Sequence, residues 1–174
     1  MKVLLKLILD CDPHAAWRAI QSPAVFREAS SPFLDFDSLE LKGFPSRWNE
    51  GDHPVKVKAG GAVGVGEQVI DIHLEPNKHP GVSIVRDSGF GVSGFTSLIT
   101  KWDHRMAIAA DPAGTGKTLY RDRLVFEAGP MTAAIWPSMW AFWQLRGARL
   151  KALAPGWTHP ESPKSEQEEK ATPA

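Results

Sequence analysis

Two polar side chains, those of His104 and Asp122, fall on the otherwise apolar face of a predicted β-hairpin. If the turn between its strands spans residues 111–115, Ala110 lies opposite Gly116 and His104 lies opposite Asp122. Buried polar groups need hydrogen-bond partners. A histidine–carboxylate pair can transfer protons, anchor a ligand or form a structural hydrogen bond, and all three roles stay open here. A register shift of one residue would remove the pairing.

The rest of this hairpin separates into an apolar face and a charged face, because side chains alternate along a strand. The inward face carries Trp102, His104, Met106, Ile108, Tyr120, Asp122, Leu124 and Phe126. The outward face carries Lys101, Asp103, Arg105, Arg121, Arg123 and Glu127. We therefore predict that Trp102, His104, Met106, Tyr120 and Asp122 contact a ligand, with His104 and Asp122 as the candidates for catalysis. Arg86 and Asp87 are a weaker candidate, since adjacent strand residues point to opposite faces.

The hairpin turn, DPAGTGKT at residues 111–118, ends like a phosphate-binding loop. That motif needs a glycine where Asp111 stands, and it needs a helix after it, whereas TLYRDRLVFEA is strand-like. Asp111 and Pro112 suit the first positions of a type I turn, and Gly114 and Gly116 suit positive φ. The stretch predicts a tight turn and no bound nucleotide.

A second glycine motif, GFGVSG at residues 89–94, matches the dinucleotide-binding pattern G-x-G-x-x-G. The residues that follow, FTSLITKW, are strand-like, so we predict a wide, bulged connection between strands instead. The chain has no H-E-x-x-H, no G-x-S-x-G and no Cys/His cluster, and Cys11 has no marked base nearby in sequence. We expect no metal and no cofactor.

The elements that must position these residues follow from hydrophobic alternation and turn signals. Residues 2–9 alternate like a strand, and Asp12-Pro13 and Ser22-Pro23 mark the starts of two short helices. Six further strand-like segments are FLDFDSLEL, HPVKVKA, EQVIDIHLE, VSIVRDS, FTSLITKWDHRMAIA and TLYRDRLVFEA. The pattern predicts seven strands.

The longest helical segment covers roughly residues 132–154, with Pro137 either starting the helix or kinking its first turn. Its apolar positions recur at spacings of four and three. They are Trp136, Trp140, Trp143, Gly147, Leu150 and Ala154, widened by Met139, Phe142 and Leu153. We predict that Trp136, Trp140 and Trp143 line a ligand cavity, although seven tryptophans in the chain could also fill the core. Residues 156–174 are polar and aperiodic, which predicts a disordered tail.

Composition sets limits on function. The 174 residues suit one domain, here residues 1–155, and 20 basic residues balance 20 acidic ones. This balance disfavours nucleic acid as a partner. A single cysteine cannot form an intrachain disulfide, and no apolar stretch reaches the ~20 residues that span a bilayer. The N-terminal apolar run lacks a cleavage site, so we expect a cytoplasmic protein.

The order of these elements resembles the helix-grip fold of the START-like superfamily, which includes polyketide cyclase-like, birch-pollen-allergen-like and lipid-transfer proteins. The likeness covers residues 1–154 and rests on three segments, DPHAAWRAIQSPAVF, the hairpin ITKWDHRM…TLYRDRLVF and AGPMTAAIWPSMWAFWQLRGARLKALA. The hairpin is similar to the W-x-H … T-x-x-x-D arrangement of uncharacterised bacterial members, with Trp102, His104, Thr118 and Asp122 in those places. The resemblance implies an α+β fold with a curved, seven-stranded antiparallel sheet around the C-terminal helix.

A helix gripped by a sheet leaves an internal cavity, and the resemblance implies a hydrophobic or aromatic ligand there, such as a lipid, polyketide or isoprenoid. A cavity of several hundred cubic ångströms is the size expected of such a site. The alternatives are a cyclase or dehydratase, in which His104 and Asp122 move protons, and a protein-interaction module. Fold membership does not choose among them, and the sequence leaves the oligomeric state open.

Overall fold

The computed structural model describes residues 1–157 of the chain. Its helices are α1 (Pro13–Ile20), α2 (Pro23–Ser30) and α3 (Thr132–Leu153), with 3-10 turns η1 (Phe95–Leu98) and η2 (Ala154–Gly156). Its strands are β1 (Lys2–Leu9), β2 (Leu34–Ser38), β3 (Gly51–Ala59), β4 (Val63–His79), β5 (Val82–Asp87), β6 (Phe90–Gly94), β7 (Lys101–Ala110) and β8 (Thr118–Glu127). Of the predicted tail, Gly156 belongs to η2 and Trp157 packs against the core, and the remainder lies outside the described residues.

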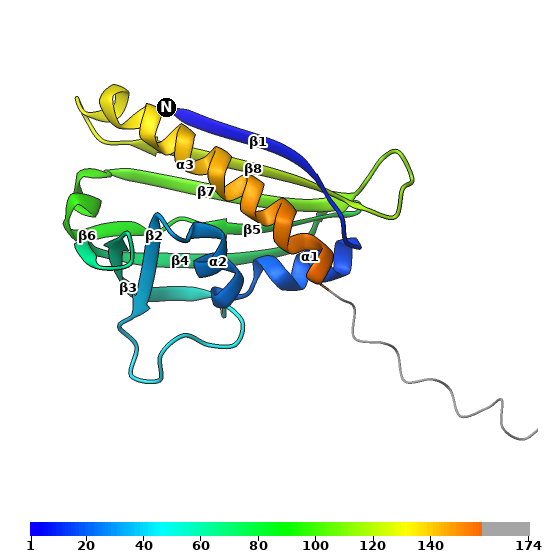
Figure 1. Cartoon of the computed structure of the whole chain (residues 1–174), viewed down its shortest axis with the longest axis horizontal. Helices are drawn as coiled ribbons and strands as arrows, with labels where there is room; N and C mark the ends of the chain where they lie inside the picture. Colours follow the sequence, from blue (N-terminus) through cyan, green and yellow to red (C-terminus); the bar gives the residue numbers. More distant parts are fainter. Residues whose placement is uncertain (158–174) are drawn as a thin grey trace, which may run out of the picture.

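The strands form one antiparallel sheet in the order β1-β8-β7-β5-β4-β3-β2, with β6 paired to β4. Figure 1 shows α3 crossing one face of this sheet, with α1 near the C-terminal end of α3. This is the predicted α+β helix-grip arrangement. The sheet has eight strands in the described residues, whereas the sequence predicted seven.

The additional strand is β6, which we had predicted to be a bulged connection. Its glycines allow the backbone to approach β4 and η1 closely. A Cβ on Gly91 would lie 2.0 Å from the Thr96 carbonyl oxygen, and Gly94 has a φ of 62°. The glycine spacing that resembled a dinucleotide motif therefore reflects close backbone packing.

The two short helices begin as predicted. The Asp12 carboxylate accepts backbone N–H bonds at the start of α1, and Ser22 does the same for α2. Pro13 and Pro23 occupy the first helical positions, where the missing N–H group has no intrahelical partner to lose. These local signals fix where both helices begin in the chain after β1.

The register of the β7–β8 hairpin differs from the prediction by two residues. Ala110 pairs with Thr118, because the loop extends to Lys117, whose carbonyl oxygen accepts from the Asp111 N–H at 2.9 Å. His104 therefore lies opposite Leu124, not Asp122. A shift of two residues leaves every side chain on its predicted face, since the side-chain period of a strand is two.

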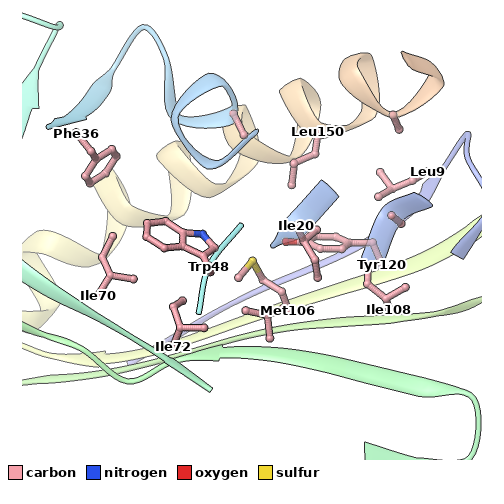
Figure 2. Packing of buried hydrophobic residues seen from close by; sticks show 14 of the residues in the cluster. Leu9, Ile20, Phe36, Trp48, Ile70, Ile72, Met106, Ile108, Tyr120 and Leu150 are labelled. Atoms are coloured by element: carbon pink, nitrogen blue, oxygen red, sulfur yellow. The ribbon is translucent and has the colours of Figure 1, made fainter. Parts of the chain in front are cut away.

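The core lies between the sheet and the helices. Figure 2 shows Trp48, from the segment between β2 and β3, among Ile70, Ile72 and Met106 of the sheet. A second cluster, at the start of α3, contains Trp143 with residues of β1 and β8.

The face that α3 turns toward the sheet also differs from the prediction. Trp143 and Leu150 are buried, as is Arg146, but Trp140 is 46% exposed. The buried face is rotated toward Met139 and Arg146, so Trp140 lies about a quarter turn from its centre at 3.6 residues per turn. Residues 128–145 contain no charged side chain, so the tryptophan spacing alone placed Trp140 on the inward face, although Trp143, Leu150 and Ala154 of the same stripe are buried as predicted.

Candidate functional site

The carboxylate of Asp122, each of whose oxygens accepts two hydrogen bonds, forms the centre of the candidate site. Its Oδ1 accepts from His104 Nε2 and Trp143 Nε1, each at 2.9 Å. Its Oδ2 accepts from Arg146 Nη1 at 2.6 Å and from the Tyr120 hydroxyl at 2.7 Å. Two strands and the long helix thus meet on one side chain, and His104 reaches it diagonally from β7. The group is satisfied internally and fixes the orientation of its neighbours.

The charges of this cluster stabilise each other. Burial raises the pKa of the Asp122 carboxyl, but the His104 ring and Arg146 outweigh this effect and hold that pKa well below its usual range. Burial and the nearby Asp122 charge raise the pKa of Tyr120 well above its usual value. Asp122 is therefore a permanent anion and Arg146 its permanent cation, so neither is suited to releasing a proton.

The chemically available group in this cluster is the His104 ring. Because Asp122 is ionised and can only accept, His104 Nε2 carries a hydrogen. Within residues 1–157 the other ring nitrogen, Nδ1, makes no hydrogen bond. It is also not among the fully buried polar atoms that lack a partner in this part of the chain. The ring lines two internal cavities. His104 can therefore exchange a proton or a hydrogen bond with a ligand through Nδ1.

A second carboxyl group, Asp87 of β5, lies directly across from His104 in the sheet. Its Oδ2 accepts from Trp102 Nε1 at 2.9 Å, and its Oδ1 accepts from the backbone N–H groups of Asp71 at 3.2 Å and Gly89 at 3.0 Å. Asp87 lines the same two cavities as His104. Burial raises the pKa of Asp87, and the His104 charge and the N–H donors offset this only in part. Asp87 thus holds its proton more readily than an ordinary aspartate.

We expect Asp87→Asn to change the pH dependence of stability. Over the pH range in which Asp87 is ionised in the unfolded chain and still protonated in the folded chain, the wild-type protein loses stability as pH rises. This loss begins near the ordinary value of 3.8 and ends above the raised pKa of Asp87. The free energy of unfolding of Asp87→Asn, relative to wild type, should increase over that window in urea titrations from pH ~4 to ~8.

The matched control for this experiment is Asp52→Asn, because Asp52 is an exposed aspartate on β3 of the same sheet. Its difference from wild type should not vary with pH in the same way. Parallel profiles for Asp87→Asn and wild type would show that folding leaves the affinity of Asp87 for its proton unchanged.

Three adjacent cavities, which share wall residues, occupy the space between the sheet and α3. The inner cavity, about 20 Å³, and the middle cavity, about 70 Å³, share Phe26, Asp87, His104 and Arg146 in their walls. The outer cavity, about 270 Å³, shares Leu34, Met139 and Phe142 with the middle one. Its lining is almost entirely apolar. The interior is thus divided, with the polar groups at the narrow end, and is not one cavity of several hundred cubic ångströms around His104.

The predicted site residues take different positions relative to these cavities. Trp102, His104 and Trp143 line the middle cavity, and Met106 lines the inner one. Tyr120 and Asp122 lie behind them, bonded to each other and to Arg146.

Two predicted tryptophans lie away from these cavities. Trp136 packs on the second cluster and donates from Nε1 to the Lys2 carbonyl oxygen at 2.9 Å. Trp140 is exposed on the outward side of α3, and neither indole is part of the three cavity walls.

Two residues of the site were not among the predicted contacts. The first is Arg146, a charged residue whose side chain is buried. The sequence feature that could have indicated this burial is the position of Arg146 within the apolar stripe, three residues after Trp143 and one before Gly147. The second is Asp87, which the sequence ranks with Arg86 as a weaker candidate, and the structure separates the two. Asp87 faces inward, and Arg86 bonds Asp103 on the outer face at 2.6 Å.

Comparisons with known proteins identify the fold. No family model matches the chain, and no curated protein matches its sequence. Among solved structures, the chain is similar to protein CV1439 from Chromobacterium violaceum, with 17% identity and a TM-score of 0.58 over 88% of this chain and 96% of that one.

Two further structures have similar overlap. Ara h 8.0201 has 12% identity and a TM-score of 0.57 over 90% of this chain and 98% of that one. A truncated norcoclaurine synthase from Thalictrum flavum has 11% identity and a TM-score of 0.58 over 88% and 92%. At these identities the likeness concerns the fold, which is the helix-grip fold. In the part of the chain that the structure describes, no helix combines the length and apolarity needed to cross a membrane.

Proposed function

We propose that this START-like protein binds an apolar small molecule non-covalently between the sheet and α3. The observation that carries the proposal is the outer cavity of about 270 Å³, whose walls are nearly all apolar and which shares Leu34, Met139 and Phe142 with the middle cavity beside Asp87 and His104. It approaches the size of known small-molecule sites. Phe33 and Phe95, two of its lining residues, are 50% and 52% exposed, so the cavity opens to solvent at this end.

The polar end of the cavities indicates which ligand chemistry fits. When Asp87 carries its proton it can donate a hydrogen bond, and His104 in its neutral form, with the hydrogen on Nε2, can accept one at Nδ1. A hydroxyl group, which both donates and accepts, satisfies the two at once. A carboxylate would meet the Asp87 carboxyl without a second cation, because Arg146 is already paired with Asp122. The proposed ligand is therefore a lipid, polyketide or isoprenoid that carries a hydroxyl or enol group.

The passage from the outer to the middle cavity depends on flexible side chains. Met139 and Phe142 of α3 and Leu34 of β2 stand at this junction. Methionine adapts readily to different packing. A ligand with a narrow polar end can reach His104 when these side chains change rotamer, while its apolar body stays in the outer cavity.

Native mass spectrometry of the purified protein tests this proposal, together with titration of the neutral apolar probe N-phenyl-1-naphthylamine. We expect a co-purifying apolar molecule or saturable probe binding, with quenching of tryptophan fluorescence because Trp102 and Trp143 line the middle cavity. No bound mass and no quenching across a panel of lipids and polyketides would contradict the proposal.

A cyclase- or dehydratase-type enzyme is the second candidate. In such an enzyme, His104 Nδ1 would act as the base and the Asp87 carboxyl as the acid, because the two residues occupy opposed positions on neighbouring strands. We propose this pair in place of the predicted His104–Asp122 pair. The variant His104→Gln separates the two candidates. An enzyme loses turnover and keeps substrate affinity, whereas a binder shows no turnover with either protein.

A further inference from the structure

The outer face of the sheet, away from α3, carries cations directly opposite one another. The register places Lys6 of β1 opposite Arg121 of β8, Arg123 of β8 opposite Arg105 of β7, and Arg105 opposite Arg86 of β5. Like charges in directly opposed positions destabilise a sheet. The whole chain has a formal net charge of zero, so this face concentrates positive charge that is balanced elsewhere.

One carboxylate neutralises part of this face. Asp103 accepts from Arg86 Nε at 2.6 Å, from Arg123 Nη2 at 3.0 Å and from Arg105 Nε at 3.2 Å. Within residues 1–157 no ion pair or side-chain hydrogen bond engages Lys6 or Arg121, and both side chains are exposed. Three arginines therefore share one anion, and two further cations have none.

The two unpaired cations border a hollow in the surface. This hollow, about 400 Å³, is lined on the outer face by Leu4, Lys6, Arg121 and Arg123, and also by Leu5 and Asp122, which stand between them in the strands and whose side chains face the interior. The position next to Arg121 on β7 is Ala107, whose small side chain leaves space beside the guanidinium. The surface here is concave, with a largely apolar lining and the cations at its border.

We propose that this hollow is a binding site for the phosphate group of a soluble phosphate monoester, held by Lys6, Arg121 and Arg123. Opposed residues on neighbouring strands have Cβ atoms about 5 Å apart, which lets the ammonium group and the guanidinium reach one anion. Guanidinium groups bind phosphate with two parallel hydrogen bonds, and lysine adds a point charge. This site lies on the opposite side of the sheet from the cavities and does not depend on the proposed ligand of the interior.

Titration with glycerol 3-phosphate tests the site, because this probe is too polar for the apolar interior. We expect backbone amide shifts in the NMR spectrum at residues 4–8 and 119–123, at constant ionic strength in chloride. In the variant Arg121→Gln the dissociation constant should rise at least about tenfold, as expected for loss of charge-assisted bonds to phosphate. Since Arg121 is exposed and faces Lys6, its thermal midpoint without phosphate should not fall.

The matched control is Arg149→Gln, which removes an exposed arginine from α3. It should leave the affinity for glycerol 3-phosphate unchanged. Equal affinity in Arg121→Gln, or shifts located elsewhere, would overturn the proposal. So would Arg121-dependent binding to phosphatidylcholine vesicles containing phosphatidic acid without binding of the soluble probe, because the anion would then be a lipid headgroup.

Discussion

Arg146→Ala lowers the free energy of unfolding by about 3–5 kcal/mol, the loss expected when one partner of a buried ion pair is removed. Arg146 Nη1 lies 2.6 Å from Asp122 Oδ2, and neither side chain reaches solvent. Without the guanidinium, the Asp122 carboxylate stays buried with neutral donors and the His104 ring. Thermal and urea unfolding measure the loss, which corresponds to a decrease in Tm of roughly 10 °C for a domain of this size.

Arg149→Ala, one helical turn further along α3, is the control. Arg149 is exposed, so its removal should change the free energy of unfolding by no more than about 0.5 kcal/mol. The double variant Asp122→Asn/Arg146→Met should be less destabilised than the sum of its single variants, by about 1 kcal/mol or more, since both charges leave together. Additive losses would show that the two residues do not act as a pair.

The acid limb of the stability profile gives an independent readout. Asp122 has a folded pKa below its unfolded value, so its contribution to stability is complete above the unfolded value near 3.8 and is lost as pH falls below it. Arg146→Ala raises the folded pKa of Asp122 toward the ordinary value. The variant should therefore lose less additional stability on acidification than the wild type does.

Met139→Trp has the largest expected effect on ligand binding. Met139 lies in the walls of both the outer and the middle cavity, so an indole at this position fills the junction between them. Excluding ~100 Å² of apolar ligand surface removes about 2.5 kcal/mol of binding free energy, or roughly 70-fold in affinity. Titration of N-phenyl-1-naphthylamine measures the change.

Two variants control this experiment, one of similar volume at the same position and one at the next residue. Met139→Leu nearly conserves volume and should retain binding, and a thermal melt of Met139→Trp shows whether overpacking destabilises the fold. Trp140→Ala should leave probe affinity unchanged, because the Trp140 indole lies on the outward side of α3. This is the reverse of what the tryptophan spacing predicted. Loss of binding in Trp140→Ala with retention in Met139→Trp would place the ligand outside the cavities described here.

The β7–β8 hairpin illustrates how far local patterns carry a prediction. The alternation of apolar and charged residues assigned each side chain to the correct face, although the predicted register was wrong by two positions. The face on which a side chain lies depends only on whether its position in the strand is odd or even. The register between two strands depends instead on the number of residues in the loop that joins them. The Asp111 N–H bond to the Lys117 carbonyl closes a longer loop than the turn residues alone predicted. His104 and Asp122 still meet, since a histidine can reach a diagonal neighbour.

The helix α3 and the strand β5 mark the limit of such patterns. In the run before Arg146, no charged residue indicated which side of the helix faces solvent. Arg146 enters the core because Asp122 is there to neutralise it, and that partner is 24 residues away in the chain. Asp87 gained its role in the same way, from His104 across the sheet.

The sequence by itself determined the caps of the first two helices, the faces of the hairpin and most of the element order, β6 excepted, because these depend on neighbours within a few residues. The helix-grip architecture followed from the resemblance of the element order to a known fold. The tertiary structure alone decided which α3 side chains face inward, the satisfaction of Asp122 by four donors, and the placement of Asp87 beside His104. Burial makes each of these polar groups depend on a partner from another element, and only the assembled fold brings those partners within hydrogen-bonding distance.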